Sequence, residues 1–232
     1  RMFHIKNYCD KIILEDKGMK KKNILIIVAI VIIIALVGGL VWYFMREDAE
    51  TKVKHQQVEN VYQGVESSKC TNIDYITENK NSDDLSDESI SYLLLNNLKK
   101  EKKLNDSISV KDLEDASKNV FGKVLLPEEM NAYLFDGYTY TLNGEEVTRE
   151  KSECPTREYV TKLYGYSSNE EELEVDVRVG YVENDTLYDM NGKELGDYSS
   201  ETVKELLDQS TLQVYRYART NDSFHLTSVD VK

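Results

Sequence analysis

An uninterrupted apolar run, Ile24 to Met45, constrains this chain more than any other feature. Its 22 residues contain no charged side chain, and Ile, Val and Leu dominate. At about 1.5 Å per residue, a helix of this length reaches roughly 33 Å, enough to cross the ~30 Å hydrocarbon layer. Trp42, Tyr43 and Phe44 end the run, where aromatic residues meet lipid headgroups. The sequence therefore predicts one transmembrane helix over residues 24–45, in contact with the lipid bilayer.

The charges on either side of this run predict its orientation. Residues 1–45 carry seven Lys or Arg and three acidic residues, whereas Arg46 is followed at once by Glu47 and Asp48. Because cytoplasmic flanks are enriched in Lys and Arg, we expect residues 1–23 to form a short basic cytoplasmic tail. The chain after residue 45 is then extracytoplasmic, in a single-pass protein of the cell membrane. A cleavable signal peptide is the competing interpretation, but it would have a shorter apolar core and small residues after it.

Residues 1–18 leave two interpretations open. Met19-Lys-Lys-Lys-Asn in front of an apolar run is how a small bacterial signal-anchor protein begins. Residues 1–18 are either a stretch that is not translated or a short genuine tail.

The rest of the chain is strongly acidic. The 232 residues hold 29 Lys and Arg against 42 Asp and Glu. Without the seven basic and three acidic residues of the first 45, 22 basic and 39 acidic residues remain, a charge of about −17. This charge favours solubility and argues against nucleic acid as a partner, because phosphate binding relies on Lys and Arg.

Helical patterns come first after the membrane segment, and strand patterns follow. Residues 46–68 predict a helical stalk or a first helix, and residues 77–89 predict a loop. Further helices are expected over 88–101, 110–120 and 199–209, and strands over 138–142, 159–166, 173–181, 212–219 and 224–231. Asn143-Gly144 and Asn191-Gly192 predict hairpin turns. Residues 69–232 are thus expected to form an extracytoplasmic α+β domain, with N-terminal helices packed on a curved antiparallel β-sheet.

Two resemblances accompany this interpretation. Met19-Lys-Lys-Lys-Asn with its apolar run, Val120-Phe-Gly, residues 138–143 and Cys154 after Lys-Ser-Glu resemble uncharacterised single-pass membrane-anchored surface proteins of low-GC bacteria. The order of elements in the extracytoplasmic part resembles the cystatin-like and NTF2-like folds. Neither resemblance implies an activity.

Cysteine usage predicts one disulfide. Cys70 and Cys154 are the two cysteines after the membrane segment, where disulfides persist. A bridge between them would connect the first helical region to the sheet. The alternative is a pair of unrelated free thiols.

Tyrosine is unusually frequent, with 16 residues against five Phe and one Trp. A Tyr-x-Tyr pattern occurs three times on expected strands, and both rings of a pair should point to one face of a sheet. If these strands are neighbours, the six rings form an aromatic surface suited to a glycan or a peptide. The alternative is that the rings cover the core beneath the helices. The candidate ligand-surface residues are Tyr138, Tyr140, Tyr164, Tyr166, Tyr215 and Tyr217.

No pattern in the sequence predicts catalytic, cofactor-binding or metal-binding residues. The chain has three His, no phosphate-binding loop and no dinucleotide-binding glycine pattern. Glu172, Glu174 and Asp176 share one face of an expected strand, which predicts a solvated acidic face or, less favourably, a calcium site.

The anchor and the lack of a catalytic pattern predict a non-enzymatic binding or interaction module. Its partner would be a protein or a glycan at the cell surface. Two alternatives stay open: a structural accessory subunit of a membrane complex, and an extracytoplasmic hydrolase. The hydrolase would need a pocket that holds His225 or a pair of acids.

Overall fold

The computed structural model describes residues 54–72, 76, 78–199, 201–221 and 223–232. Residues Gln57–Lys232 form one compact unit of helices and antiparallel sheets, so the predicted α+β class is confirmed. In the part of the chain that the structure describes, no helix is both long and apolar enough to span a membrane. The predicted transmembrane helix over residues 24–45 and the predicted tail over residues 1–23 lie outside the described residues.

The strands form two sheets where the sequence predicted one. In the larger sheet, strands follow the order β1-β11-β10-β7-β8-β9, and β6 also pairs with β7. Strand β7 is long enough to pair with three strands. Strands β10 and β8 pair one after the other along one of its edges, and β6 pairs along the other edge. The strands of this sheet are β1 (Lys80–Asn81), β6 (Glu158–Ser168), β7 (Glu172–Glu183), β8 (Thr186–Asp189), β9 (Glu194–Asp197), β10 (Thr211–Thr220) and β11 (Ser223–Val231).

The second sheet has four strands in the order β2-β5-β4-β3. Its central hairpin turns at Asn143-Gly144, as the sequence predicted, and Gly144 has the positive φ that this turn requires. The short flanking strands were not predicted from the sequence. The strands are β2 (Ser107–Ser109), β3 (Tyr133–Phe135), β4 (Tyr138–Asn143) and β5 (Glu146–Lys151).

Two of the helices begin at serine capping residues. Residues 54–62 are helical. Helix α2 (Asp87–Lys100) begins after Ser86, whose Oγ accepts a hydrogen bond from Ser89 N. Helix α3 (Val110–Phe121) begins at a capping box between Ser109 and Asp112 and ends at Gly122 in the left-handed conformation. The predicted helix over residues 199–209 is shorter in the structure, where α4 spans only Val203–Leu207.

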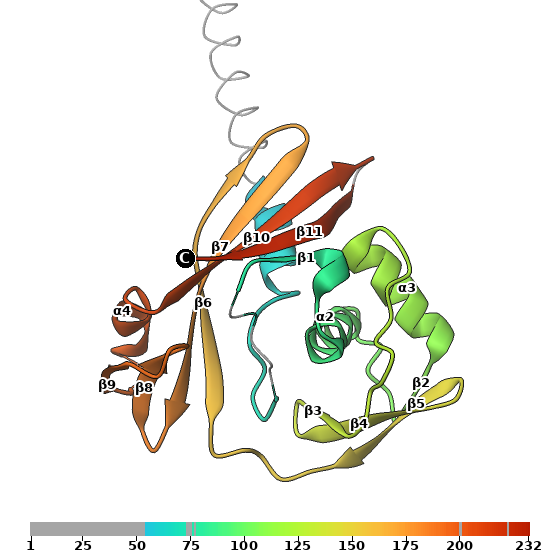
Figure 1. Ribbon diagram of the computed structural model, residues 1–232, viewed down its shortest axis with the longest axis horizontal. Coiled ribbons are helices and arrows are strands. Elements are labelled where there is room, and N and C mark those ends of the chain that lie inside the picture. The colour runs from blue at the N-terminus through green and yellow to red at the C-terminus, as the bar shows by residue number, and fades with distance from the viewer. Residues whose placement is uncertain (1–53, 73–75, 77, 200, 222) are drawn as a thin grey trace, which may run out of the picture. The chain divides into compact units, whose positions relative to one another are not determined.

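The core lies around α2, which Figure 1 shows between the two sheets. Every residue of α2 from Ser89 to Leu98 is buried. The alternating row Leu173, Val175, Val177 and Val179 of β7 faces this core, as predicted from its period of two. On the side of the second sheet, Phe135 makes edge contacts with Tyr92 and Tyr140.

Cys70 and Cys154 form a disulfide, with 4.6 Å between their Cα atoms. Cys154 lies between β5 and β6, and Cys70 lies before β1. The bridge therefore attaches the chain in front of the first strand to the connection between the two sheets.

Candidate functional site

The predicted surface of six tyrosines does not exist, because the three pairs lie in two different sheets. Tyr138 and Tyr140 are on β4 in the four-stranded sheet. Tyr140 is fully buried against Phe135, and half-buried Tyr138 stacks on the Arg149 guanidinium at 4.3 Å. This pair therefore belongs to a different sheet from the other two.

The pair on β10 belongs to the core, which was the alternative considered from the sequence. Tyr215 and Tyr217 are both buried and lie opposite Val175 and Leu173 of β7. Burial raises the pKa of both phenols, and the Tyr215 hydroxyl donates to Gln213 Oε1 at 2.8 Å. Neither ring is available to a ligand.

The pair on β6 is exposed, but its two rings lie on opposite faces of the sheet. The register with β7 shifts between Leu163 and Gly165, and this bulge interrupts the alternation of side chains. Tyr166 lies opposite buried Val175, whereas Tyr164 stacks on Arg178 at 4.6 Å. The Tyr166 and Tyr164 rings remain 40% and 52% exposed, but they do not form the common aromatic surface that was predicted.

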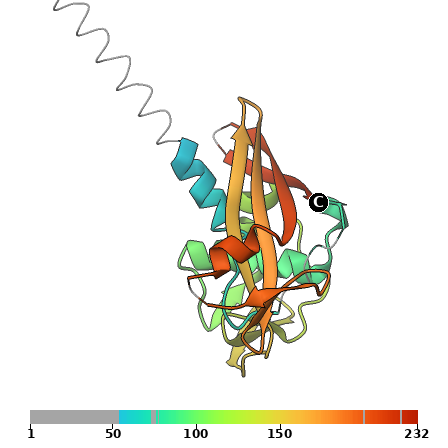
Figure 2. The ribbon, with the colours of Figure 1, turned by 90° about the vertical axis from the view of Figure 1, so that its left-hand side faces the viewer.

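Strand β6 is also an open edge of the larger sheet. Among the described strands it pairs only with β7. No backbone-to-backbone hydrogen bond from the described loops reaches residues 158–168. We call the side of these residues that faces away from β7 the β6 edge. Figure 2 shows this strand on the face that also carries α4.

A groove of about 450 Å³ lies along the middle of the β6 edge. Its floor is the stretch from Val160 to Leu163, and Tyr198 lies at its rim. One wall is the turn after the first described helix, and the other is α4 with its flanking residues. We call this hollow the β6 groove; the walls are Tyr62, Glu66 and Ser67 on one side and Val203, Lys204 and Leu207 on the other.

Thr161 holds the first wall in place. Its Oγ1 accepts a hydrogen bond from Ser67 N at 2.9 Å and lies 3.3 Å from the Tyr62 hydroxyl. Burial raises the pKa of Tyr62, and its hydroxyl also contacts the backbone of Leu163. These contacts cover only the middle of the β6 edge.

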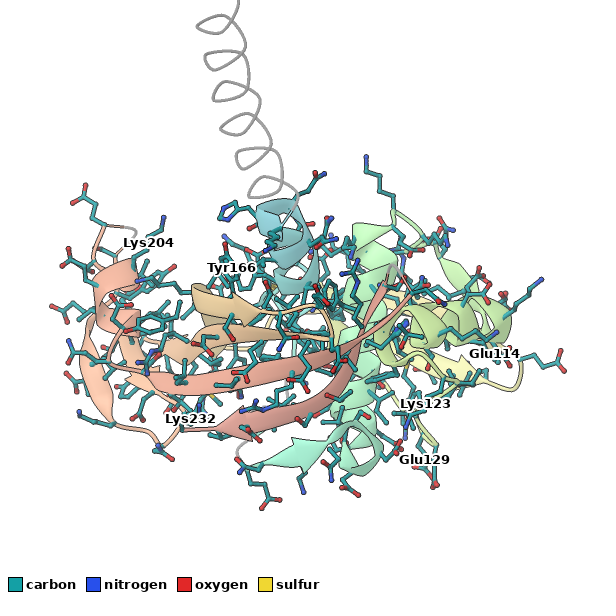
Figure 3. All side chains as sticks on the ribbon, turned by 90° about the horizontal axis from the view of Figure 1, so that it is seen from above. Glu114, Lys123, Glu129, Tyr166, Lys204 and Lys232 are labelled. Carbon is teal, nitrogen blue, oxygen red and sulfur yellow. A yellow bond between two sulfur atoms is a disulfide. The ribbon has the colours of Figure 1, made fainter. Side chains whose placement is uncertain are left out.

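Lys162 holds the second wall. Its Nζ donates to the Lys204 carbonyl at 2.8 Å and to Asp208 Oδ1 at 2.5 Å, which connects β6 to both ends of α4. The Lys162 charge is therefore already compensated. Figure 3 shows the labelled Lys204 and Tyr166 on one side of the molecule and Glu129 on the far side.

Glu66 is the carboxylate that lines the groove. Partial burial raises the pKa of Glu66, and the charge of Glu59 raises it further, while Lys99 acts against both. Glu66 and Ser67 also line a smaller hollow of about 220 Å³ on their other side, which includes Asn96 and Lys99. The Lys99 Nζ donates to Asp136 Oδ1 at 2.9 Å and to Ser68 Oγ at 3.1 Å. An added cation beside Glu66 would therefore stabilise the ionised form of this carboxyl group.

Sequence reasoning found Tyr164 and Tyr166 but missed the groove. Tyr62 and Glu66 precede Thr161 by about 100 residues in the chain, and no local pattern connects them to it. The signal available in the sequence was the long strand pattern over residues 159–166, which does not reveal which edge of a strand is left unpaired.

The other residues considered from the sequence have structural contacts. Glu174 pairs with Arg216, which also contacts Asp230 at 3.0 Å. The described residues contain no cluster of three or more His, Cys, Asp or Glu side chains that could hold a metal ion. His225 lies against the end of α3, with its Nδ1 3.2 Å from the Asn119 carbonyl oxygen.

The site combines a strand edge that pairs with no other described strand, a half-apolar groove and two exposed aromatic rings on opposite faces of the sheet. A strand edge of this kind is a place where an extended chain can add to a sheet. Comparisons of the chain with protein-family models, with curated proteins and with solved structures find no match.

Proposed function

We propose that this chain is a single-pass membrane protein whose extracytoplasmic domain is a non-enzymatic binding module. In this proposal residues 24–45 anchor the chain in the bilayer, residues 1–23 are cytoplasmic, and the domain of helices packed on a curved antiparallel sheet lies outside. The apolar run and its flanking charges support the anchor. The disulfide between Cys70 and Cys154 supports an oxidising location for the domain.

The ligand is an extended segment of a partner protein, and it binds along the β6 edge. One observation carries this proposal: an eleven-residue strand has one edge to which no described strand pairs, and a groove lies along the middle of that edge. An extended peptide that adds to such an edge gains backbone hydrogen bonds, and neighbouring pockets select its side chains. We favour a protein partner over a glycan because the tyrosines form no continuous aromatic platform.

Site-specific photocrosslinking tests this function in the full chain in its own membrane. A photoreactive amino acid at Tyr164 or Tyr166 should yield one discrete adduct. The same residue at Val124, which is 50% exposed and follows α3, should yield none. No adduct from either β6 position, or the same adduct from Val124, would count against the proposed site.

Two substitutions give a second readout of the same site. Tyr164→Ala with Tyr166→Ala should leave the unfolding midpoint nearly unchanged, because exposed side chains contribute little to stability. An adduct formed from a third β6 position, Ser167, should be lost in this double variant. Unchanged crosslinking from Ser167 would show that the rings do not bind the partner.

A further inference from the structure

The β6 edge departs from the way the other outer strands of this protein are protected. Natural sheets keep outer strands short or covered, because a long unpaired strand recruits other chains. The outer strands β1, β2, β3 and β9 have two, three, three and four residues. Helix α3 and β1 cover β11, through contacts that include His225 with the Asn119 carbonyl. Strand β6 has eleven residues, and among the described strands it pairs along one edge only.

Several carboxylates lie along this edge and next to the turn at its end. Glu66 lines the groove with a carboxylate whose pKa is raised by partial burial and by Glu59. Asp176 lies beside Gly165, and its Oδ2 is 3.6 Å from the point that a Cβ on this glycine would occupy. The turn that follows β6 and the first residue of β7 contribute three more carboxylates: Glu170, Glu171 and Glu172.

The cations nearby are mostly engaged. Lys162 is bound by Asp208 and by the Lys204 carbonyl. Arg178 donates to the Ser210 carbonyl at 2.6 Å and lies under the Tyr164 ring. Lys204 lines the groove, but Glu201 and Glu205 flank it in the sequence. With about −17 on residues 46–232, a second copy of this chain is a poor occupant, because the two copies repel each other.

We propose, on the basis of the proposed function, that the β6 edge accepts a basic extended segment of a partner protein as an added strand. The segment donates and accepts backbone hydrogen bonds along residues 164–168, beyond the stretch of β6 that Ser67 and Tyr62 contact at Thr161 and Leu163. One of its Lys or Arg side chains enters the β6 groove and approaches Glu66. A second cationic side chain on the same face of the added strand lies on the exposed part of the Tyr166 ring, whereas Tyr164 is on the opposite face and stacks on Arg178. The negative field of the domain steers such a segment toward the edge.

Peptide titrations with the full chain in detergent micelles test this inference. The probes are fluorescent peptides of about eight residues that alternate Thr with Lys, with Gln or with Glu, and a Thr/Lys peptide with alternate backbone nitrogens methylated. The Thr/Lys peptide should bind about ten-fold more tightly than the Thr/Gln peptide, and the Thr/Glu peptide most weakly. Methylation should weaken the Thr/Lys peptide about ten-fold, because it removes the backbone donors of an added strand.

Each result separates the inference from the function on which it rests. Binding by none of the peptides would overturn both. Equal binding of the Thr/Lys and Thr/Gln peptides would leave strand addition standing and overturn the basic preference. Equal binding of the methylated and unmethylated Thr/Lys peptides would reduce the interaction to charge attraction and overturn strand addition.

A matched pair of variants tests whether the preference for the basic peptide arises at the β6 groove. Glu66→Gln should reduce the ratio of Thr/Lys to Thr/Gln affinity by about three-fold or more. Glu129→Gln, an exposed residue on the far side of the molecule, should leave the ratio unchanged. An equal effect of both variants would mean that only the total charge of the domain matters.

Discussion

At the scale of single residues, the negative charge of Glu66 lowers the stability of the fold, whereas in the proposed complex the same charge attracts a basic ligand. Its pKa is raised above 4.5 by partial burial and then by Glu59, so the fold disfavours its charge. The protein therefore loses stability as the pH rises from below 4.5 through the raised pKa. We expect Glu66→Gln to raise the unfolding midpoint at pH 7 by about one or two degrees, and the difference to close near pH 4. Thermal unfolding across this pH range checks it; a variant less stable than the parent at pH 7 would contradict the assignment.

Gly180 of β7 fixes how closely α4 approaches the sheet. A Cβ at this position would lie 2.6 Å from the Tyr188 carbonyl oxygen and 3.3 Å from Leu207 of α4. Gly180→Ala should cost about 1–3 kcal/mol of unfolding free energy, because the backbone oxygen has no room to move aside. Gly165→Ala is the control, since its nearest atom is 3.6 Å away at the end of the Asp176 side chain. Urea unfolding of the two variants should separate them clearly, and equal midpoints would contradict this close approach.

At the scale of elements, the attachment of α4 to β6 shapes the groove. Lys162 makes this attachment through the Lys204 carbonyl and Asp208. Lys162→Met should leave the sheet intact but increase hydrogen exchange of the amides of residues 203–207 by about several-fold. Asp208→Asn, which keeps a hydrogen-bond acceptor, should have a smaller effect. Unchanged exchange in Lys162→Met would mean that α4 is held by Leu207 packing alone.

Elements determined by local chemistry were predicted from the sequence, and those determined by distant partners were not. The capping box at Ser109 and the Asn143-Gly144 turn each lie within a few residues, so α3 and the β4–β5 hairpin were predicted closely. Strands β1, β2 and β3 have two or three residues and exist because a partner strand is present. The division of the strands into two sheets depends on the same long-range pairing. For this reason the sequence identified Tyr164 and Tyr166 but placed them in an aromatic surface that the two sheets separate.

At the scale of the whole molecule, the disulfide connects the segment before the first strand to the connection between the sheets. Cys70 and Cys154 are 84 residues apart. Closing a loop of this length limits the unfolded chain, and the chain-entropy model gives a stabilisation of roughly 4 kcal/mol. The variant with both Cys70→Ser and Cys154→Ser should lose about this much in urea unfolding. It should match the parent under reducing conditions; a parent whose stability is unaffected by reduction would contradict this role.

Hydrogen exchange along β6 tests the central claim, that the β6 edge accepts an extended chain, most directly. The full chain in detergent micelles would be measured with and without the Thr/Lys peptide at a saturating concentration. We predict slower exchange of the amides of residues 164–168 that face away from β7, because an added strand gives them hydrogen-bond acceptors. The amides of α3 should exchange unchanged. Saturating binding without added protection on β6 would place the peptide elsewhere and contradict the claim.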